Sequence, residues 1–270
     1  MALLKEQPHL DPAAAASLLE EIGQFEEAEK LYRKLAAQSQ KLEATIYLAR
    51  FLGLRNKVDE ALSICEKVWP TDPLVAASTS VMILYAGKSK GSHHQQVAER
   101  LGTAIKANPS KFELLNCLAA VRRLQKDFPA VASLYREVLK HDTRDTLTFN
   151  NLSWVLALSD KDGSGALKCI QQAIELDGPQ AEFLDTRAVA HLTMGNADLA
   201  VKDLDEAIAE APTAHRYFHL AQAHHLAGKR SAAIDALRRA RNLGLTETTV
   251  DPLERQAYHR LVGELDRKGK

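Results

Sequence analysis

Apolar residues recur along this chain with the spacing of an amphipathic helix, and the same block of pattern returns at regular intervals. In block 195–208, Ala200, Leu204 and Ile208 fall at i, i+4 and i+8, on one side of an α-helix. Related blocks begin at residues 23, 56, 92, 126, 161, 195 and 228. The steps between successive starts are 33, 36, 34, 35, 34 and 33 residues, so one unit recurs seven times.

A second apolar segment precedes each block, which predicts that the repeating unit is a pair of helices. The segment "FLDTRAVAHLTM" precedes Gly195, and "YFHLAQAHHLA" precedes Gly228. Each glycine stands where the first helix must end, a place that favours a residue tolerating positive φ. Prolines follow most blocks, at or near the next boundary: Pro73, Pro109, Pro179 and Pro212. No segment has a strand pattern, so we predict an all-α fold.

Small residues at matching positions predict close contact between the two helices of a pair. The sixth copy has Ala188 and Ala200, and the seventh has Ala221 and Ala233. The third copy lacks a clear small residue in its first helix and carries an insertion at 87–94.

The combined pattern resembles the tetratricopeptide repeat, which alternates bulky, small and aromatic positions over two helices. In the seventh copy these positions hold Tyr217, Leu220, Ala221, His224, Ala233, Leu237 and Ala240. The stretch from residue 181 onward is also similar to bacterial proteins of this family that have no assigned role. The resemblance implies a right-handed α-solenoid of about seven helix pairs, with residues 1–270 as a single array. The predicted repeats span 9–41, 42–75, 76–111, 112–145, 146–180, 181–213 and 214–246.

The last segment predicts one more helix, over 251–268, that caps the end of the array. Asp251 is a good N-cap, and Pro252 suits the first helical position. An apolar face would cover the last repeat while polar residues face water. That face comprises Leu253, Ala257, Tyr258, Leu261 and Val262.

The resemblance also implies where a partner binds, on a concave groove lined by the first helix of each copy. The family's contact positions correspond to Tyr47, Arg50, Asn116, Ala120, Arg123, Asn150, Asn151, Trp154, Asp185, Val189, His215, His219, Gln222 and His225. Phe218 is expected to add shape beside His219.

Several of these side chains have two interpretations. Asn151 matches a family position where an Asn amide binds a peptide backbone, since an amide both donates and accepts hydrogen bonds. Alternatively, Asn150 and Asn151 bond to their own array or to water. Trp154 is either an anchor for a partner or a wedge between neighbouring first helices. Arg50 and Arg123 either hold a carboxylate or are solvated.

Composition narrows the class of partner. Lys plus Arg and Asp plus Glu number 35 each, so the net charge is zero and argues against nucleic-acid binding. No apolar run reaches the length of a membrane span, and the start does not read as a signal peptide. Cys65, Cys117 and Cys169 form no CxxC motif and predict small core residues in a reducing compartment, so we expect a cytoplasmic protein.

The search for reaction chemistry predicts neither an enzyme nor a cofactor. No phosphate-binding glycine loop, nucleophile elbow or acid–base pair at usable spacing occurs. His215 and His219 stand at i and i+4, but two ligands do not complete a zinc site, so no metal is predicted.

The sequence therefore predicts a non-catalytic interaction scaffold that binds an unidentified peptide or protein segment. Two alternatives stay open at this stage. One is a self-association module, and the other is a regulatory C-terminal region of a larger multidomain protein.

Overall fold

The computed structural model describes residues 11–39 and 41–266, and every regular element within them is helical. The helices are α2 (Pro12–Glu21), α3 (Phe25–Gln38), α4 (Leu42–Leu54), α5 (Val58–Cys65), α6 (Pro73–Ala86), α7 (Gly91–Ala107), α8 (Glu113–Leu124), α9 (Phe128–His141), α10 (Thr146–Val155), the π-helical turn η1 (Leu156–Asp160), α11 (Gly163–Asp177), α12 (Ala181–Thr193), α13 (Ala197–Glu210), α14 (Ala214–Leu226), α15 (Arg230–Asn242) and α16 (Arg255–Leu265). The all-α prediction is confirmed.

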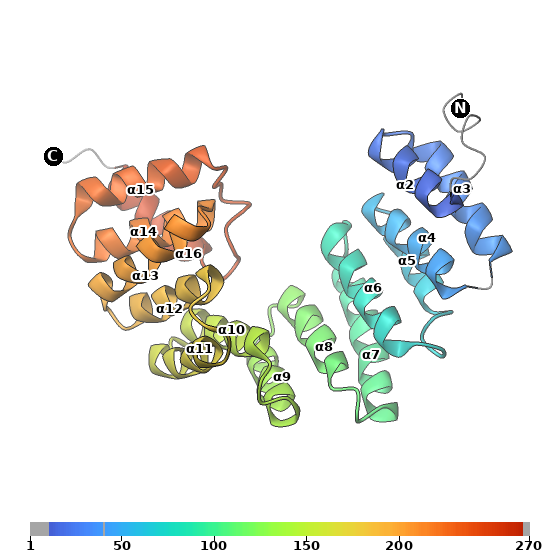
Figure 1. The fold of residues 1–270 in the computed structure, drawn as a ribbon, viewed down its shortest axis with the longest axis horizontal. Helices are drawn as coiled ribbons and strands as arrows, with labels where there is room; N and C mark the ends of the chain where they lie inside the picture. The colour runs from blue at the N-terminus through green and yellow to red at the C-terminus, as the bar shows by residue number, and fades with distance from the viewer. Residues whose placement is uncertain (1–10, 40, 267–270) are drawn as a thin grey trace. The chain divides into compact units, whose positions relative to one another are not determined.

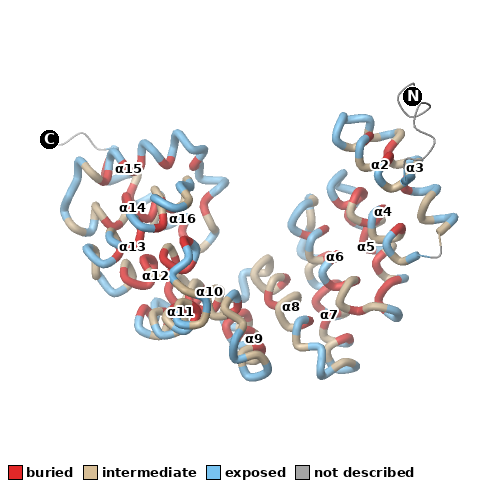
Figure 2. The backbone as a smooth tube through the Cα atoms, viewed as in Figure 1, coloured by how far each residue is buried: buried red, intermediate tan, exposed pale blue. Residues whose placement is uncertain are grey.

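The chain forms two compact units, Met1–Asp127 and Phe128–Lys270 (Figure 1). Inside each unit the first helices of successive pairs contact one another, as α4 does with α6 and α12 does with α14. The second helix of a pair also packs on the next first helix, as α11 does on α12. Buried residues lie mainly where helices of a unit face each other, so each pair covers apolar surface of its neighbour (Figure 2).

The small residues occupy the helix contacts that the pattern predicts. Ala188, Ala200, Ala221 and Ala233 are all fully buried, and they share one core cluster. A methyl group at these positions leaves room for the facing helix, while larger residues such as Leu204 fill the space between.

The turn inside most pairs contains a left-handed residue; the α6–α7 turn, where Gly87 has a φ of −93°, does not. Gly195 and Gly228 have φ values of 81° and 71°, as expected for residues that end a helix. At the equivalent turns Asn56, Lys126 and Lys161 adopt φ values of 62°, 60° and 56°. The geometry of the repeat therefore forces three L side chains into a strained conformation.

Prolines and caps mark the starts of helices. Pro73 is the first residue of α6, and the Asp72 side chain caps that helix by accepting a hydrogen bond of 3.1 Å from the backbone nitrogen of Val75. Pro109, Pro179 and Pro212 lie in the connections before α8, α12 and α14. The expected boundary positions are confirmed.

The C-terminal helix is present but starts later than the sequence predicts. It begins at Arg255, because Asp251 closes a short turn instead of capping a helix at Pro252. Asp251 Oδ1 accepts a hydrogen bond of 2.9 Å from the backbone nitrogen of Leu253. The predicted end at residue 268 lies outside the described residues. Leu261 and Leu265 are buried against the last helix pair, as a terminal cap requires.

Within the described residues no helix has the combination of length and apolar character that crossing a membrane demands.

Candidate functional site

One position on each first helix of the second unit lines up across successive helix pairs. Asn151 on α10, Asp185 on α12 and His219 on α14 follow one another at intervals of 34 residues. Glu254, in the turn before α16, lies 35 residues beyond His219 and continues the series. Because neighbouring first helices contact each other, residues in this register lie side by side.

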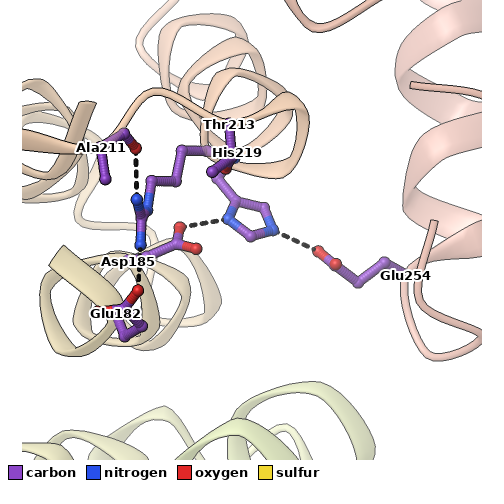
Figure 3. Close-up of polar contacts among 7 residues, drawn as sticks. Glu182, Asp185, Ala211, Thr213, His219 and Glu254 are labelled. Atoms are coloured by element: carbon purple, nitrogen blue, oxygen red, sulfur yellow. Dashed lines mark hydrogen bonds and ion pairs between the residues drawn. The ribbon is translucent and has the colours of Figure 1, made fainter. Parts of the chain in front are cut away.

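His219 is enclosed between two carboxylates of this series. Its Nδ1 lies 2.5 Å from Asp185 Oδ1, and its Nε2 lies 3.0 Å from Glu254 Oε1 (Figure 3). The ring is fully buried, and the Glu254 side chain is nearly so. Burial alone would lower the pKa of His219, but the two negative charges and their hydrogen bonds raise it well above its ordinary value. The ring therefore carries a proton on both nitrogens and ties α12 to the C-terminal segment.

Arg216 forms a second link between α12 and α14. Its guanidinium donates to the Ala211 carbonyl and, over 3.1 Å, to Glu182 Oε1 (Figure 3). Arg216 is buried while the Glu182 side chain is exposed, so this ion pair lies at the edge of the helix contact. Thr213 caps α14 by accepting a hydrogen bond of 3.2 Å from the backbone nitrogen of Arg216.

Trp154 packs against the ring of the buried His219. The centres of the Trp154 and His219 rings are 5.7 Å apart, and the tryptophan is half-buried. Its indole Nε1 is shielded from solvent and has no hydrogen-bond partner among the described residues. The helix changes to π-helical geometry directly after Val155, an irregularity that often accompanies functional positions.

A small hollow adjoins this cluster between α14 and α16. It has a volume of about 230 Å³ and is lined by Leu192, Gln222, His225, Leu226, Ala257, Arg260, Leu261 and Glu264. His225 Nε2 and Glu264 Oε2 lie 2.6 Å apart across it. Gln222 Nε2 is buried there without a hydrogen-bond partner in the described part of the chain. The hollow is lined by three leucine side chains and by the Gln222 amide, whose Nε2 atom has no partner among the described residues.

The two neighbouring asparagines lie on α10. Both are half-buried, and Asn150 Oδ1 is shielded from solvent without a partner among the described residues. The Asn151 side chain makes no hydrogen bond within residues 11–39 and 41–266. The Asn151 amide therefore retains capacity for a hydrogen bond to a bound molecule, whereas Asn150 Oδ1 is unpaired but enclosed.

Metal and thiol chemistry have no visible basis here. Across residues 11–39 and 41–266, no group of three or more His, Cys, Asp or Glu side chains could hold a metal ion. His215, the second histidine of the weak zinc pattern, lies 2.9 Å from the Thr249 carbonyl through Nε2. Burial raises the pKa of the Cys65 and Cys117 thiols to about 11, so both stay protonated and unreactive at neutral pH.

Comparison with known proteins identifies the repeat. No curated protein matches the chain in sequence. Residues 186–244 match the family model described as tetratricopeptide repeat, in the region of the sixth and seventh predicted copies. Residues 186–244, which contain α13, α14 and α15, therefore carry the sequence pattern of tetratricopeptide repeats.

Solved structures of tetratricopeptide-repeat proteins have a similar fold. A tetratricopeptide repeat protein from Parabacteroides merdae aligns with a TM-score of 0.67 at 13% identity, over 95% of this chain and 98% of that one. PilW, a type IV pilus biogenesis factor, aligns with a TM-score of 0.57 at 16% identity, over 73% of this chain and 93% of its own. A chain of the Cut9–Hcn1 hetero-tetramer aligns with a TM-score of 0.58 at 13% identity, over 95% of this chain and 53% of its own.

Two of the predicted contact residues lie in the core of the second unit. Phe218 and His219 are both fully buried, so in this structure neither presents surface to a partner. Phe218 packs edge-on against Tyr258 of α16, with ring centres 5.8 Å apart. The cause is the C-terminal segment, which covers α14 in the way that the first helix of a further repeat would.

The residues on the α16 side of the hollow were not found from the sequence, although a signal for them existed. Ala257 and Arg260 lie 35 residues beyond Gln222 and His225. Extending the repeat period by one step past the last recognised copy would have placed them beside those two residues.

The remaining predicted residues belong to the first unit. Arg50 on α4 is half-buried, and its Nη2 lies 3.4 Å from Glu20 Oε2. Asn116 and Arg123 lie on α8, are half-buried and already interact with other residues. Tyr47 is exposed on α4, and the Ala120 carbonyl on α8 accepts a hydrogen bond of 3.0 Å from Tyr85. These five residues belong to the first unit, and the other predicted residues belong to the second.

Proposed function

We propose that the protein is a non-catalytic scaffold that binds a peptide or protein segment on the first-helix face of its second unit. This face comprises Asn150, Asn151, Trp154, Asp185, Gln222 and His225. Proteins of this fold generally mediate contacts between proteins, which supports the class of function.

The unpaired polar atoms of the face carry the proposal. Asn150 Oδ1, Trp154 Nε1 and Gln222 Nε2 are shielded from solvent and lack partners among the described residues. These atoms have no exposed surface, so a ligand reaches them only when the side chains turn outward. A buried polar group without a partner costs about 1–3 kcal/mol, and completing its hydrogen bond recovers that energy. The set holds two donors and one acceptor, and a polypeptide backbone supplies both complements at regular intervals.

The ligand contacts are proposed to be local. Leu192 and Leu226 give the adjoining hollow apolar walls that accept one side chain of the segment. Asn151 supplies a further hydrogen bond to its backbone. His219 and Phe218 act from beneath this face by fixing the helices that present it.

Affinity capture from a native lysate, with proteins quantified by mass spectrometry, tests this function. We expect the wild-type chain to capture proteins that a variant with Asn151→Ala and Gln222→Ala fails to capture. Gln172→Ala on α11 is the matched control, because Gln172 is exposed and bonds only to Glu175. The proposal fails if the double variant and the control capture the same proteins in equal amounts.

Direct titration of a captured partner's segment completes the test. We expect the double variant to bind it roughly tenfold or more weakly than the control does, since two hydrogen bonds are lost. Equal affinities by calorimetry would place the binding surface elsewhere.

A further inference from the structure

A second hollow of the second unit lies away from the first-helix face, between the second helices α11 and α13. It has a volume of about 530 Å³, and residues of α12 line it as well. Leu167 of α11 and Leu199 of α13 provide apolar surface, and Leu199 is 50% exposed. This outer groove is independent of the site proposed above.

The floor of the outer groove contains an ion pair between Arg187 and Asp203. Arg187 donates two hydrogen bonds, of 2.8 and 2.7 Å, to the two carboxylate oxygens of the buried Asp203. This paired geometry neutralises the carboxylate. His191 is also buried in the floor, and its Nδ1 has no partner among the described residues.

The rim of the outer groove is positive. Lys168 of α11 and Lys202 of α13 both line it and are exposed. Within residues 11–39 and 41–266 neither lysine side chain makes an ion pair or a hydrogen bond. The exposed Glu206, one helical turn beyond Lys202, acts electrostatically on Arg187 in the floor. Asp198, at the start of α13, already lies 3.3 Å from Lys229 and does not line the groove. The outer groove therefore offers apolar walls between two free ammonium groups.

The first unit carries a surface with the opposite character, in the turn from α2 to α3. Ile22 is 60% exposed at this turn, and Leu18 beside it on α2 is 44% exposed. Glu21 and Glu26 flank the turn, both are exposed, and neither makes an ion pair in the described part of the chain. Three cations lie nearby. Arg55 is engaged over the Phe25 ring, 3.7 Å from its centre, and Lys30 lies 2.7 Å from Glu27. The exposed Lys34 lines a shallow hollow together with Ile22. The α2–α3 turn is thus an apolar knob flanked by two carboxylates without ion pairs, which outnumber Lys34, the one unpaired cation beside it in the described part of the chain.

We propose that the α2–α3 turn of one copy binds in the outer groove of a second copy, so that the protein self-associates head to tail. Ile22 enters between Leu167 and Leu199, while the two glutamates meet the two lysines. Charge complementarity selects this occupant, and electrostatic matching of this kind favours encounter and fixes orientation. Because the contact joins two different surfaces, each added copy leaves one knob and one groove free.

Sedimentation velocity of the full chain over a wide concentration range tests this self-association. We expect the weight-average sedimentation coefficient to rise with protein concentration and to fall again when salt screens the rim charges. Lys168→Glu with Lys202→Glu should weaken association roughly tenfold or more, and Glu21→Lys with Glu26→Lys should do the same. Circular dichroism checks that both variants keep the native helix content.

Mixing the two variants makes the test decisive. Each variant alone meets like charges, but in the mixture the lysine-bearing turn meets the glutamate-bearing groove and the native turn meets the native groove. We therefore expect the mixture to associate when neither component does. Lys106→Glu with Arg144→Glu is the matched control for net charge, since both residues are exposed and their side chains make no ion pair among the described residues.

Three results would overturn the proposal. One is a wild-type chain that stays monomeric at every concentration. Another is a groove variant that associates as strongly as the control, which would point to a different face. The third is a mixture of the two variants that stays monomeric.

Discussion

At the scale of single residues, the most constrained group is the buried imidazolium of His219. It balances two carboxylates that would otherwise repel each other inside a core. Glu254 Oε2 keeps no hydrogen-bond partner among the described residues, so the cluster has no surplus of donors. Loss of the proton would leave Asp185 and Glu254 facing a neutral ring.

This arrangement predicts a pH-dependent stability. The pKa of His219 is raised in the folded state, so its stabilising contribution is complete below the unfolded value of about 6.5 and is lost as pH rises through the folded pKa. Urea unfolding of the wild type and of His219→Gln should differ most near pH 6 and less in alkaline solution. His259→Gln, which alters an exposed histidine, controls for the loss of an imidazole as such. A constant difference across pH would contradict the protonated state.

The left-handed turn residues give a second prediction at this scale. Lys161 is exposed and adopts a φ of 56°, a conformation that glycine reaches without steric cost. Lys161→Gly should therefore stabilise the second unit by about 0.5–1 kcal/mol. The same substitution inside helix α11, Lys168→Gly, should destabilise it by about 1 kcal/mol. Chemical denaturation of both variants would show whether the two effects have opposite signs.

At the scale of helices, the alanine contacts determine how closely a pair packs. Ala200 and Ala221 are fully buried, so glutamate at either position would force a charge into a helix contact. Ala200→Glu or Ala221→Glu should lower the free energy of unfolding by at least about 3 kcal/mol. Leu199→Glu, on an exposed position of the same helix, should change it by less than about 1 kcal/mol. Thermal melts that leave Ala200→Glu unchanged would mean that the helix register is wrong.

The helices could be predicted from the sequence because their apolar pattern is periodic. The site was predicted less well, because the burial of a side chain on one helix depends on which segment packs over that helix. Apolar spacing and the turn glycines located the helix pairs without any tertiary information. The burial of His219 followed from Glu254, which continues the 34-residue series but lies in an irregular turn beyond the last recognised copy. The start of α16 was misplaced for a related reason, since the Asp251 side chain can close a turn as readily as it caps a helix. The proposed repeat boundaries and contact residues stay predictions.

At the scale of the whole molecule, the division into two units predicts unfolding in more than one step. Each unit has its own core, and long arrays lose cooperativity when neighbouring contacts are uneven. The two tryptophans lie one in each unit, Trp69 in the first and Trp154 in the second.

Single-tryptophan variants can follow each unit separately. With Trp69→Phe as background, Ala221→Glu should shift the urea midpoint that Trp154 reports. With Trp154→Phe as background, the same substitution should shift the midpoint that Trp69 reports by much less. Equal shifts in both backgrounds would show that the chain unfolds as a single cooperative body.

The contact between Trp154 and His219 has an optical consequence. Protonated imidazole quenches indole emission more strongly than the neutral ring does, and these two rings lie 5.7 Å apart. In a Trp69→Phe background the native fluorescence should therefore brighten as alkali removes the proton from His219, before the helices melt. The fluorescence of Trp154 would therefore report the ionisation of His219 without any added label.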